Sequence, residues 1–319
     1  MRCKKGLKVW YTNADGFINK RSELSLLLNN VDEKPHIIAI TEVKPKNTKY
    51  PLLASELSIS GYNHFSAYIE GSKGRGIVIY VDCRLKATQL EIPVNFQENL
   101  LLEITNVKKN INLLFGAIYR SPNSTAQNDL ELNEVIKYVN KKHTGSKIFV
   151  GDFNYSQINW SNWAVYDSAS NSDSAKKFLS CLRKHFMFQH VSEPTRFRAQ
   201  HEPHVLDLVI TDEDFIDSLE YCSPLGKSDH AILSFVCNFS PEMLPLEPRL
   251  NLNKGNYNGL REFLAEEWDR EFPDRDTVDE MWSEFREILD DGIRRHIPFT
   301  KPWKKNSKWH YPIDTEYKK

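Results

Sequence analysis

Short apolar runs alternate with amphipathic segments from residue 7 to about residue 239 of this chain. The apolar runs are rich in valine and isoleucine and have the length of buried strands. They cover residues 7–12, 37–40, 77–81, 113–118, 147–150, 206–210 and 231–233. The pattern therefore predicts a core in which β-strands predominate.

Three segments between these runs have apolar residues at the spacing of an α-helix. Their apolar positions are 24, 27, 28 and 31, then 132, 135, 136 and 139, and then 175, 178, 179 and 182. Ser172 or Asp173 is suited to cap the third helix. Some strands are joined by connections of hairpin length, as around residues 107–110, whereas others are separated by a helix. This mixture predicts two packed mixed sheets with helices outside them, rather than one doubly wound parallel sheet.

The composition changes after Phe239, so we expect residues 1–239 to form one domain and residues 240–319 a separate region. Pro241, Pro245 and Pro248 predict a linker between them.

Within the second region, residues 260–293 are acidic and helical in pattern. Their apolar stripe consists of Trp282, Phe285, Leu289 and Ile293. The stripe predicts a helix that packs on the main domain or on a following one. Asp290 and Asp291 have no flanking strand, so we interpret them as a solvated face rather than a metal-binding pair. Residues 301–319 are basic with two tryptophans interleaved, which favours a disordered linker over a nucleic-acid contact.

The bulk composition restricts the class of protein only broadly. The chain has 319 residues, 40% hydrophobic and 27% charged, with a formal net charge of −1. A nucleic-acid partner would therefore need a local basic surface. No apolar run approaches the ~20 residues of a membrane span, so we expect no membrane partner. The five cysteines are scattered, which indicates reduced intracellular thiols rather than a disulfide framework or a zinc site.

Polar residues follow many of the predicted strands at the points where the strands end. Residues 151–154 (Gly-Asp-Phe-Asn) follow the run at 147–150, and Gly151 would let the backbone turn there. The candidate functional residues at such positions are Asn13, Glu42, Tyr119, Asp152, Asn154, Asp207, Asp229 and His230. Taken singly, each is ordinarily a turn residue, a helix cap or an edge aromatic. Taken together, they place carboxylates, amides and an imidazole on rigid elements.

This set of side chains suits the hydrolysis of a phosphodiester by water. Glu42 offers the hard oxygen ligand that Mg²⁺ prefers, and such an ion neutralises phosphate and a leaving oxyanion. Asp207 lies inside an apolar run, where a carboxylate needs a partner. His230 is the candidate partner, because a carboxylate fixes an imidazole tautomer and favours the imidazolium.

In this order the motifs resemble the endonuclease/exonuclease/phosphatase superfamily, which includes exonuclease III and apurinic endonucleases. The resemblance covers residues 7–239, and it is closer to the endonuclease domain of non-LTR (LINE-type) retrotransposons of the jockey/CR1-like group. The segments that carry it are 117–123 (AIYRSPN), 158–160 (INW), 191–196 (VSEPTR) and 224–230 (PLGKSDH). The sequence departs from the family at Arg75-Gly76, where a glycine pair is usual before the middle strand.

The resemblance implies a four-layer α/β sandwich, here with a helical C-terminal extension. It also implies an intracellular enzyme, acting in the nucleus, that uses Mg²⁺, or Mn²⁺ in its place, to nick DNA and prime reverse transcription. In an intact element a reverse transcriptase would be covalently linked, and residues 240–319 would be the connector toward it. We find no polymerase motif in the chain.

Roles follow from the resemblance position by position. Glu42 and Asn13 match metal-binding positions, and Asp229 matches a second metal-side or proton-handling carboxylate. Asp152 matches the residue that positions or activates water, while Asn154 and Tyr119 match groups at the phosphate. His230 and Asp207 match the histidine–aspartate pair, with His230 either the base or a stabiliser of transition-state charge. The expected phosphate contacts are Arg120, Arg196, Arg198 and Lys227.

Two other functions remain open at the level of sequence. A phosphatase or phosphodiesterase of the same fold could act on lipids or small phosphoesters, and it would lack the basic side chains that a DNA enzyme places around its site. A remnant of a mobile element could bind DNA without catalysis, although all the candidate residues are present.

Overall fold

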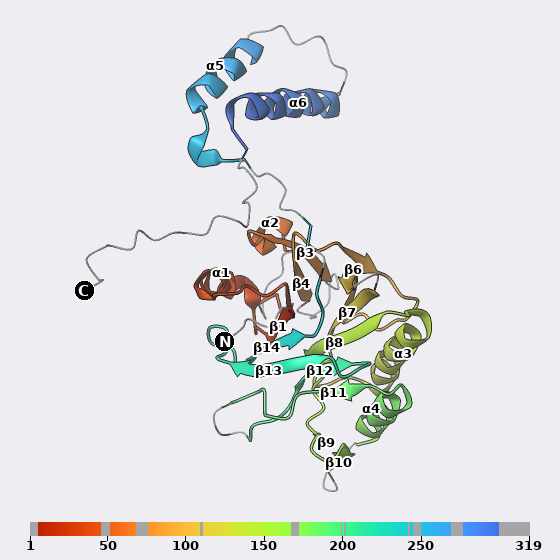
Figure 1. The fold of residues 1–319 in the computed structure, drawn as a ribbon. Helices are drawn as coiled ribbons and strands as arrows, with labels where there is room; N and C mark the ends of the chain where they lie inside the picture. Colours follow the sequence, from red (N-terminus) through yellow and green to blue (C-terminus); the bar gives the residue numbers. More distant parts are fainter. Residues whose placement is uncertain are drawn as a thin grey trace, which may run out of the picture. The chain divides into compact units, whose positions relative to one another are not determined.

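The computed structural model describes residues 6–45, 52–67, 76–108, 111–166, 172–198, 200, 202–241, 243–244, 250–268 and 277–299. Residues 1–244 form one compact unit and residues 245–319 a second. Figure 1 shows the path of the chain from the first strand to the last helix. The predicted boundary at residue 239 lies a few residues before the division between the units.

Two six-stranded mixed sheets make up most of the first unit. In the first sheet the order is β13 (Ile216–Cys222), β14 (Ile232–Cys237), β1 (Leu7–Asn13), β2 (Ile37–Thr41), β4 (Ile77–Asp82) and β3 (Tyr62–Ala67). In the second it is β11 (Phe188–Gln189), β12 (Asp207–Thr211), β8 (Ser146–Asp152), β7 (Ile111–Tyr119), β6 (Asn99–Lys108) and β5 (Ala87–Leu90). Only the pairs β1–β2 and β7–β8 are parallel among these described strands. A small hairpin of β9 (Ile158–Asn159) and β10 (Ala164–Val165) follows β8.

The sheets pack face to face, and helices cover their outer faces. Buried residues of both sheets form one apolar cluster between them, which includes Val9, Ala39, Phe115 and Val150. On the outer face of the first sheet lie α1 (Arg21–Asn30), preceded by the 3-10 turn η1 (Phe17–Lys20), and α2 (Ala54–Leu57). On the outer face of the second lie α3 (Ala126–Lys142) and α4 (Asp173–Lys184) (Figure 1). The predicted four-layer α/β sandwich is confirmed.

The predicted helix periodicity is confirmed in α1, α3 and α4: Leu24 and Leu28 are buried in α1, and all four apolar positions of the stripe are buried in α3 and in α4. Thr125 caps α3 by accepting a hydrogen bond from the Asn128 N–H at 3.2 Å. Ser172 occupies the N-cap position of α4, but its side chain makes no capping bond.

Gly151 differs from the sequence prediction. It does not turn the chain, because β8 continues through it to Asp152 and its φ is not positive. Instead, a Cβ at this position would lie 2.0 Å from the Ile118 carbonyl oxygen of the neighbouring strand. Glycine is therefore required by close backbone approach, and the turn comes later, at Asn154, whose φ is 50°.

The second unit contains a 3-10 turn, η2 (Leu252–Lys254), and two helices, α5 (Tyr257–Trp268) and α6 (Val278–His296). The helices pack on each other where Gly292 faces Leu260 and Phe263. The Trp282 and Phe285 rings stack with centroids 5.5 Å apart, and Trp282 is 59% exposed within the described chain. Asp291 pairs with Arg295 at the surface of α6, in agreement with a solvated face. Two parts of the predicted second region lie outside the described residues: residues 245–249, which include Pro245 and Pro248 of the predicted linker, and the basic tail at residues 301–319.

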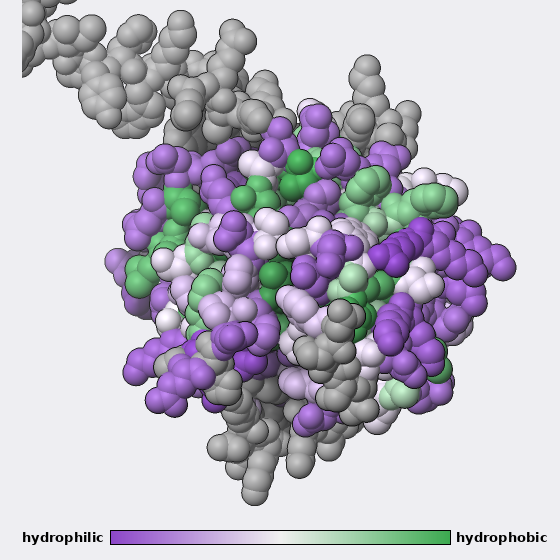
Figure 2. Space-filling view, turned by 90° about the horizontal axis from the view of Figure 1, so that it is seen from below, coloured by the Kyte–Doolittle hydropathy of each residue, from purple (hydrophilic) through white to green (hydrophobic). Residues whose placement is uncertain are grey.

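The surface of the molecule is mixed in character. On the face in Figure 2, hydrophilic residues surround small and separate hydrophobic patches. Among the described helices, none is long and apolar enough to cross a membrane.

Candidate active site

The candidate residues gather at one edge of the sandwich because of the strand directions. The two parallel pairs bring the carboxyl ends of β1, β2, β7 and β8 to this edge, and β12 and β14 begin there. In the second sheet, Tyr119, Asp152 and Asp207 are aligned in register across three neighbouring strands. In the first sheet, Asn13 ends β1 and Glu42 follows β2. Residues that are far apart in sequence thus come from both sheets to one place.

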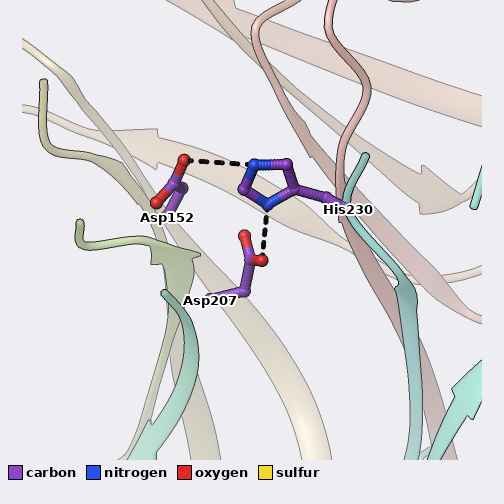
Figure 3. Close-up of side chains that lie close together, drawn as sticks. All are labelled: Asp152, Asp207 and His230. Atoms are coloured by element: carbon purple, nitrogen blue, oxygen red, sulfur yellow. Dashed lines mark hydrogen bonds and ion pairs between the residues drawn. The ribbon is translucent and has the colours of Figure 1, made fainter. Parts of the chain in front are cut away.

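An imidazole between two carboxylates forms the centre of the site (Figure 3). His230 Nδ1 lies 2.6 Å from Asp207 Oδ2, and His230 Nε2 lies 3.9 Å from Asp152 Oδ2. All three residues are buried, and Asp207 is completely so. The predicted pairing of Asp207 with His230 is present, and the short Nδ1 contact sets the ring orientation.

Burial and mutual charge shift the protonation of this group. Burial lowers the pKa of His230, but the carboxylates of Asp207, Asp152 and Asp229 together outweigh that effect and raise the pKa to about 9, with Asp207 contributing most. Burial raises the pKa of Asp152 to about 7, assisted by the negative charge of Asp207. At neutral pH the imidazole is therefore cationic, while Asp152 binds a proton more readily than an exposed aspartate does.

Two amides hold the Asp152 carboxylate in place. Asn13 Nδ2 donates to Asp152 Oδ2 at 2.9 Å, and the Asn154 N–H donates to Asp152 Oδ1 at 3.2 Å. The Asn154 side chain in turn donates to the Arg120 carbonyl oxygen at 2.8 Å. The left-handed turn at Asn154 thus closes on the acid that precedes it, and asparagine tolerates that conformation better than most residues.

Glu42 and Tyr119 connect the two sheets at the same edge. The Tyr119 hydroxyl donates to Glu42 Oε1 at 2.9 Å. Glu42 has a φ of 55°, and its carbonyl oxygen accepts a hydrogen bond from the Gly16 N–H at 2.8 Å. A glutamate in this strained backbone conformation is typical of a functional position.

The site has the ligand chemistry of a metal centre. Ligand atoms of Asp152, Asp207 and His230 lie within 4.8 Å of one another. Within this group the Asp207 oxygens accept from Tyr11 and face His230, while the Asp152 oxygens accept from Asn13 and from the Asn154 N–H. With Glu42 nearby in the fold, hard carboxylate oxygens predominate, and these fit Mg²⁺. The predicted metal roles of Glu42, Asn13 and Asp229 stay predictions.

The four predicted phosphate contacts differ in their placement. Arg120 is buried and forms a bidentate ion pair with Asp129, at 2.6 and 3.0 Å, so it acts as a structural brace between the end of β7 and α3. Arg196 Nε lies 3.0 Å from Asp229 Oδ2 beside the site. Arg198 and Lys227 are exposed. Burial and pairing of Arg120 make it the weakest of the four as a ligand for phosphate.

Two residues that hold the site were missed in the sequence. Tyr11 donates to Asp207 Oδ1 at 3.0 Å, and Thr195 Oγ1 accepts from the Leu206 and Asp207 N–H groups at 3.2 and 3.0 Å. Tyr11 had one available signal, since a tyrosine in a buried strand needs a partner for its hydroxyl. Thr195 lies in one of the motifs that carry the resemblance, but nothing in the sequence indicates which groups it would contact.

Comparison with known proteins agrees with this geometry. Residues 113–234 match the family model described as Endonuclease-reverse transcriptase. No curated protein matches the chain. The endonuclease domain of TRAS1, a telomere-specific non-LTR retrotransposon, is similar over 74% of this chain and 99% of its own, with 18% identity and a TM-score of 0.55.

Two further solved structures have the same fold. The 3′ phosphatase NExo from Neisseria, bound to a product DNA hairpin, aligns over 72% of this chain and 98% of its own, with 14% identity and a TM-score of 0.53. The AP endonuclease LMAP from Leishmania major aligns over 72% and 87%, with 11% identity and a TM-score of 0.54. The unit that holds the Asp152–His230–Asp207 group therefore has an α/β sandwich fold of the endonuclease/exonuclease/phosphatase type, and its residues 113–234 match the Endonuclease-reverse transcriptase family model.

Proposed function

We propose that this protein is a metal-dependent phosphodiester hydrolase that nicks DNA. The observation that carries the proposal is the buried arrangement in which His230 lies between Asp207 and Asp152, at a sheet edge shared with Glu42 and Tyr119. A structural ion pair would need only one carboxylate, whereas here a buried imidazole lies between two, and burial raises the pKa of one of them, Asp152.

Each residue has a role that its contacts support. Asp152, fixed by Asn13 and Asn154, orients the attacking water and accepts its proton. The imidazolium of His230 stabilises negative charge that develops on the phosphate, and Asp207 fixes its tautomer and orientation.

Tyr119 positions the Glu42 carboxylate, and we expect its hydroxyl to contact the phosphate. Glu42, Asn13 and Asp229 are the residues that would hold Mg²⁺ or Mn²⁺. The ion, when bound, supplies neutralisation of the phosphate and of the leaving oxygen.

DNA is the substrate class that the comparisons favour. The similar proteins include a retrotransposon endonuclease domain and a phosphatase bound to a DNA hairpin. Arg196, Arg198 and Lys227 supply positive charge to a DNA backbone near the site. We infer that nicking serves retrotransposition, in the nucleus, with a reverse transcriptase linked to this chain in the intact element.

The test is the nicking of supercoiled plasmid by the purified chain. We expect Mg²⁺ to support nicking and EDTA to abolish it. Asp152→Ala and His230→Ala should each lower the rate about 10²- to 10⁴-fold. His190→Ala is the matched control, because His190 bonds Thr211 at the opposite end of β12 and has no place in the site.

Unchanged nicking in both site variants would refute the proposal. Weak nicking with rapid release of phosphate from a phospholipid headgroup or a small phosphoester would instead favour a phosphatase of the same fold. Binding of DNA by the wild type without nicking under any divalent cation would favour an inert remnant.

A further inference from the structure

Tyr11 is a buried polar side chain that the mechanism above leaves unused. It lies in β1, is fully buried, and belongs to the apolar cluster between the two sheets. Its hydroxyl lies 3.0 Å from Asp207 Oδ1 and 3.0 Å from Thr41 Oγ1. A tyrosine hydroxyl can donate one hydrogen bond and accept another. The Tyr11 hydroxyl therefore uses both functions, by donating to Asp207 and accepting from Thr41.

The two oxygens of Asp207 are thus engaged by two side chains of the other sheet. Tyr11, from β1, bonds Oδ1, while His230, just before β14, bonds Oδ2 at 2.6 Å. Asp207 itself begins β12 in the second sheet, where its N–H donates to Thr195. The backbone of Asp207 is fixed by Thr195, and the orientation of its carboxylate is fixed by the bonds to its two oxygens. Tyr11 supplies one of those bonds.

We infer that Tyr11 is a positioning residue for the phosphodiester hydrolysis proposed above, acting through Asp207 to fix the His230 imidazole. The inference rests on that proposed function. Without the hydroxyl, Oδ1 would be a buried acceptor with no donor, and the carboxylate would turn toward another partner. Nδ1 of His230 would then lose its aligned acceptor, and Nε2, which faces Asp152 at 3.9 Å, would move with the ring.

The protonation state of Tyr11 agrees with a permanent donor. Burial raises the pKa of its hydroxyl well above the usual value, and the negative charges of Asp207 and Asp152 raise it further. The group is therefore a neutral hydrogen-bond donor at neutral pH. Its contribution is geometric, and it takes no part in proton transfer.

The kinetic test is Tyr11→Phe, which removes the hydroxyl and keeps the ring. Tyr80→Phe is the matched control, because Tyr80 is also fully buried in the first sheet and its hydroxyl donates to the Leu57 carbonyl at 2.6 Å, outside the site. We expect Tyr11→Phe to lower kcat for plasmid nicking about 10- to 100-fold with little change in KM. Tyr80→Phe should leave both constants unchanged. An equal loss in both variants, or a loss confined to KM, would overturn the inference.

A double-mutant cycle separates action through Asp207 from a general loss of packing. In an Asp207→Asn background, the further change Tyr11→Phe should cost less than about threefold in kcat. If the loss of kcat in the double variant equals the product of the losses in the two single variants, the two residues act independently and the inference is overturned.

A second readout does not depend on activity. The Nδ1 proton of His230, bonded to a carboxylate at 2.6 Å, should give a far-downfield proton NMR resonance that is absent in His230→Asn. We expect this resonance to remain in Tyr80→Phe and to shift upfield or broaden in Tyr11→Phe. An unchanged resonance in Tyr11→Phe would overturn the inference. Dependence of the resonance on Tyr11 in a protein that does not nick DNA would support the hydrogen-bond role while refuting the proposed function.

Discussion

His230 has two opposing influences on its charge, and Asp207 decides between them. A buried imidazole prefers to be neutral, because its cation loses hydration. The Asp207 carboxylate at 2.6 Å is the largest influence against that preference, and with Asp152 and Asp229 it brings the pKa to about 9. A group with a raised pKa contributes stability below its unfolded value of 6.5 and loses it as the pH rises through the folded value. The pair therefore stabilises the fold at neutral pH and keeps a positive charge where phosphate would bind.

Asp207→Asn removes the charge while keeping the size of the side chain. We expect the pKa of His230 to fall below about 9, because burial still lowers it and only the weaker influences of Asp152 and Asp229 still raise it. The direction follows from the causes, since the largest influence that raises the pKa is lost and the one that lowers it remains. NMR titration of the His230 ring protons measures the value, and His190 in the same spectra serves as a reference. A His230 pKa that stays near 9 would show that Asp152 or Asp229 holds the charge instead.

Strand ends carry the site, and strand direction explains why they meet. The apolar runs predicted β1, β2, β4, β7, β8, β12 and β14 well, because a strand buried on both faces is continuously apolar. The strand order and the parallel pairing of β7 with β8 depend on contacts between distant segments, which no local pattern encodes. The pairing of His230 with Asp207 is predictable from the sequence, because an isolated carboxylate in an apolar run requires a partner.

Other features of the site could not be predicted from the sequence, because they depend on contacts between segments that only the fold brings together. Arg120 follows a strand end, as a phosphate contact would, but its bidentate partner Asp129 lies on α3 and is brought there by the fold. The prediction for Gly151 was also wrong, because the glycine allows close approach of two strands rather than a turn. Both a turn and a close backbone approach require glycine, and only the register of Ile118 with Gly151 distinguishes them.

Gly151→Ala tests the close approach between β7 and β8. The added Cβ would lie 2.0 Å from the Ile118 carbonyl oxygen, a backbone atom that is held by the sheet. We expect a loss of at least about 3 kcal/mol in the free energy of unfolding. Gly116→Ala, in β7, is the matched comparison, because its Cβ would meet side-chain atoms of Phe149 and Leu101 at 2.7 and 2.8 Å, and these can move. Urea denaturation of both variants gives the ranking, and an equal or smaller loss for Gly151→Ala would contradict it.

The candidate site residues all lie in the first of the two units of the chain. Every site residue from Asn13 to His230 lies in residues 1–244, together with all three hydrophobic clusters. Both sheets contribute to the site, so its geometry depends on their packing. Strand β14 supports this packing, because it is an interior strand of the first sheet, between β13 and β1.

Residues 1–244 should therefore fold alone and retain nicking at a rate within about twofold of the full chain, because a compact unit with its own core is independent. Circular dichroism with thermal unfolding, followed by the plasmid assay, tests this. A chain that ends at residue 231, just before β14, is the control, because it removes an interior strand and leaves β1 without its antiparallel partner. That chain should not fold cooperatively. Aggregation of residues 1–244, or a folded unit without activity when the full chain is active, would show that the second unit is required by the sandwich or by its substrate.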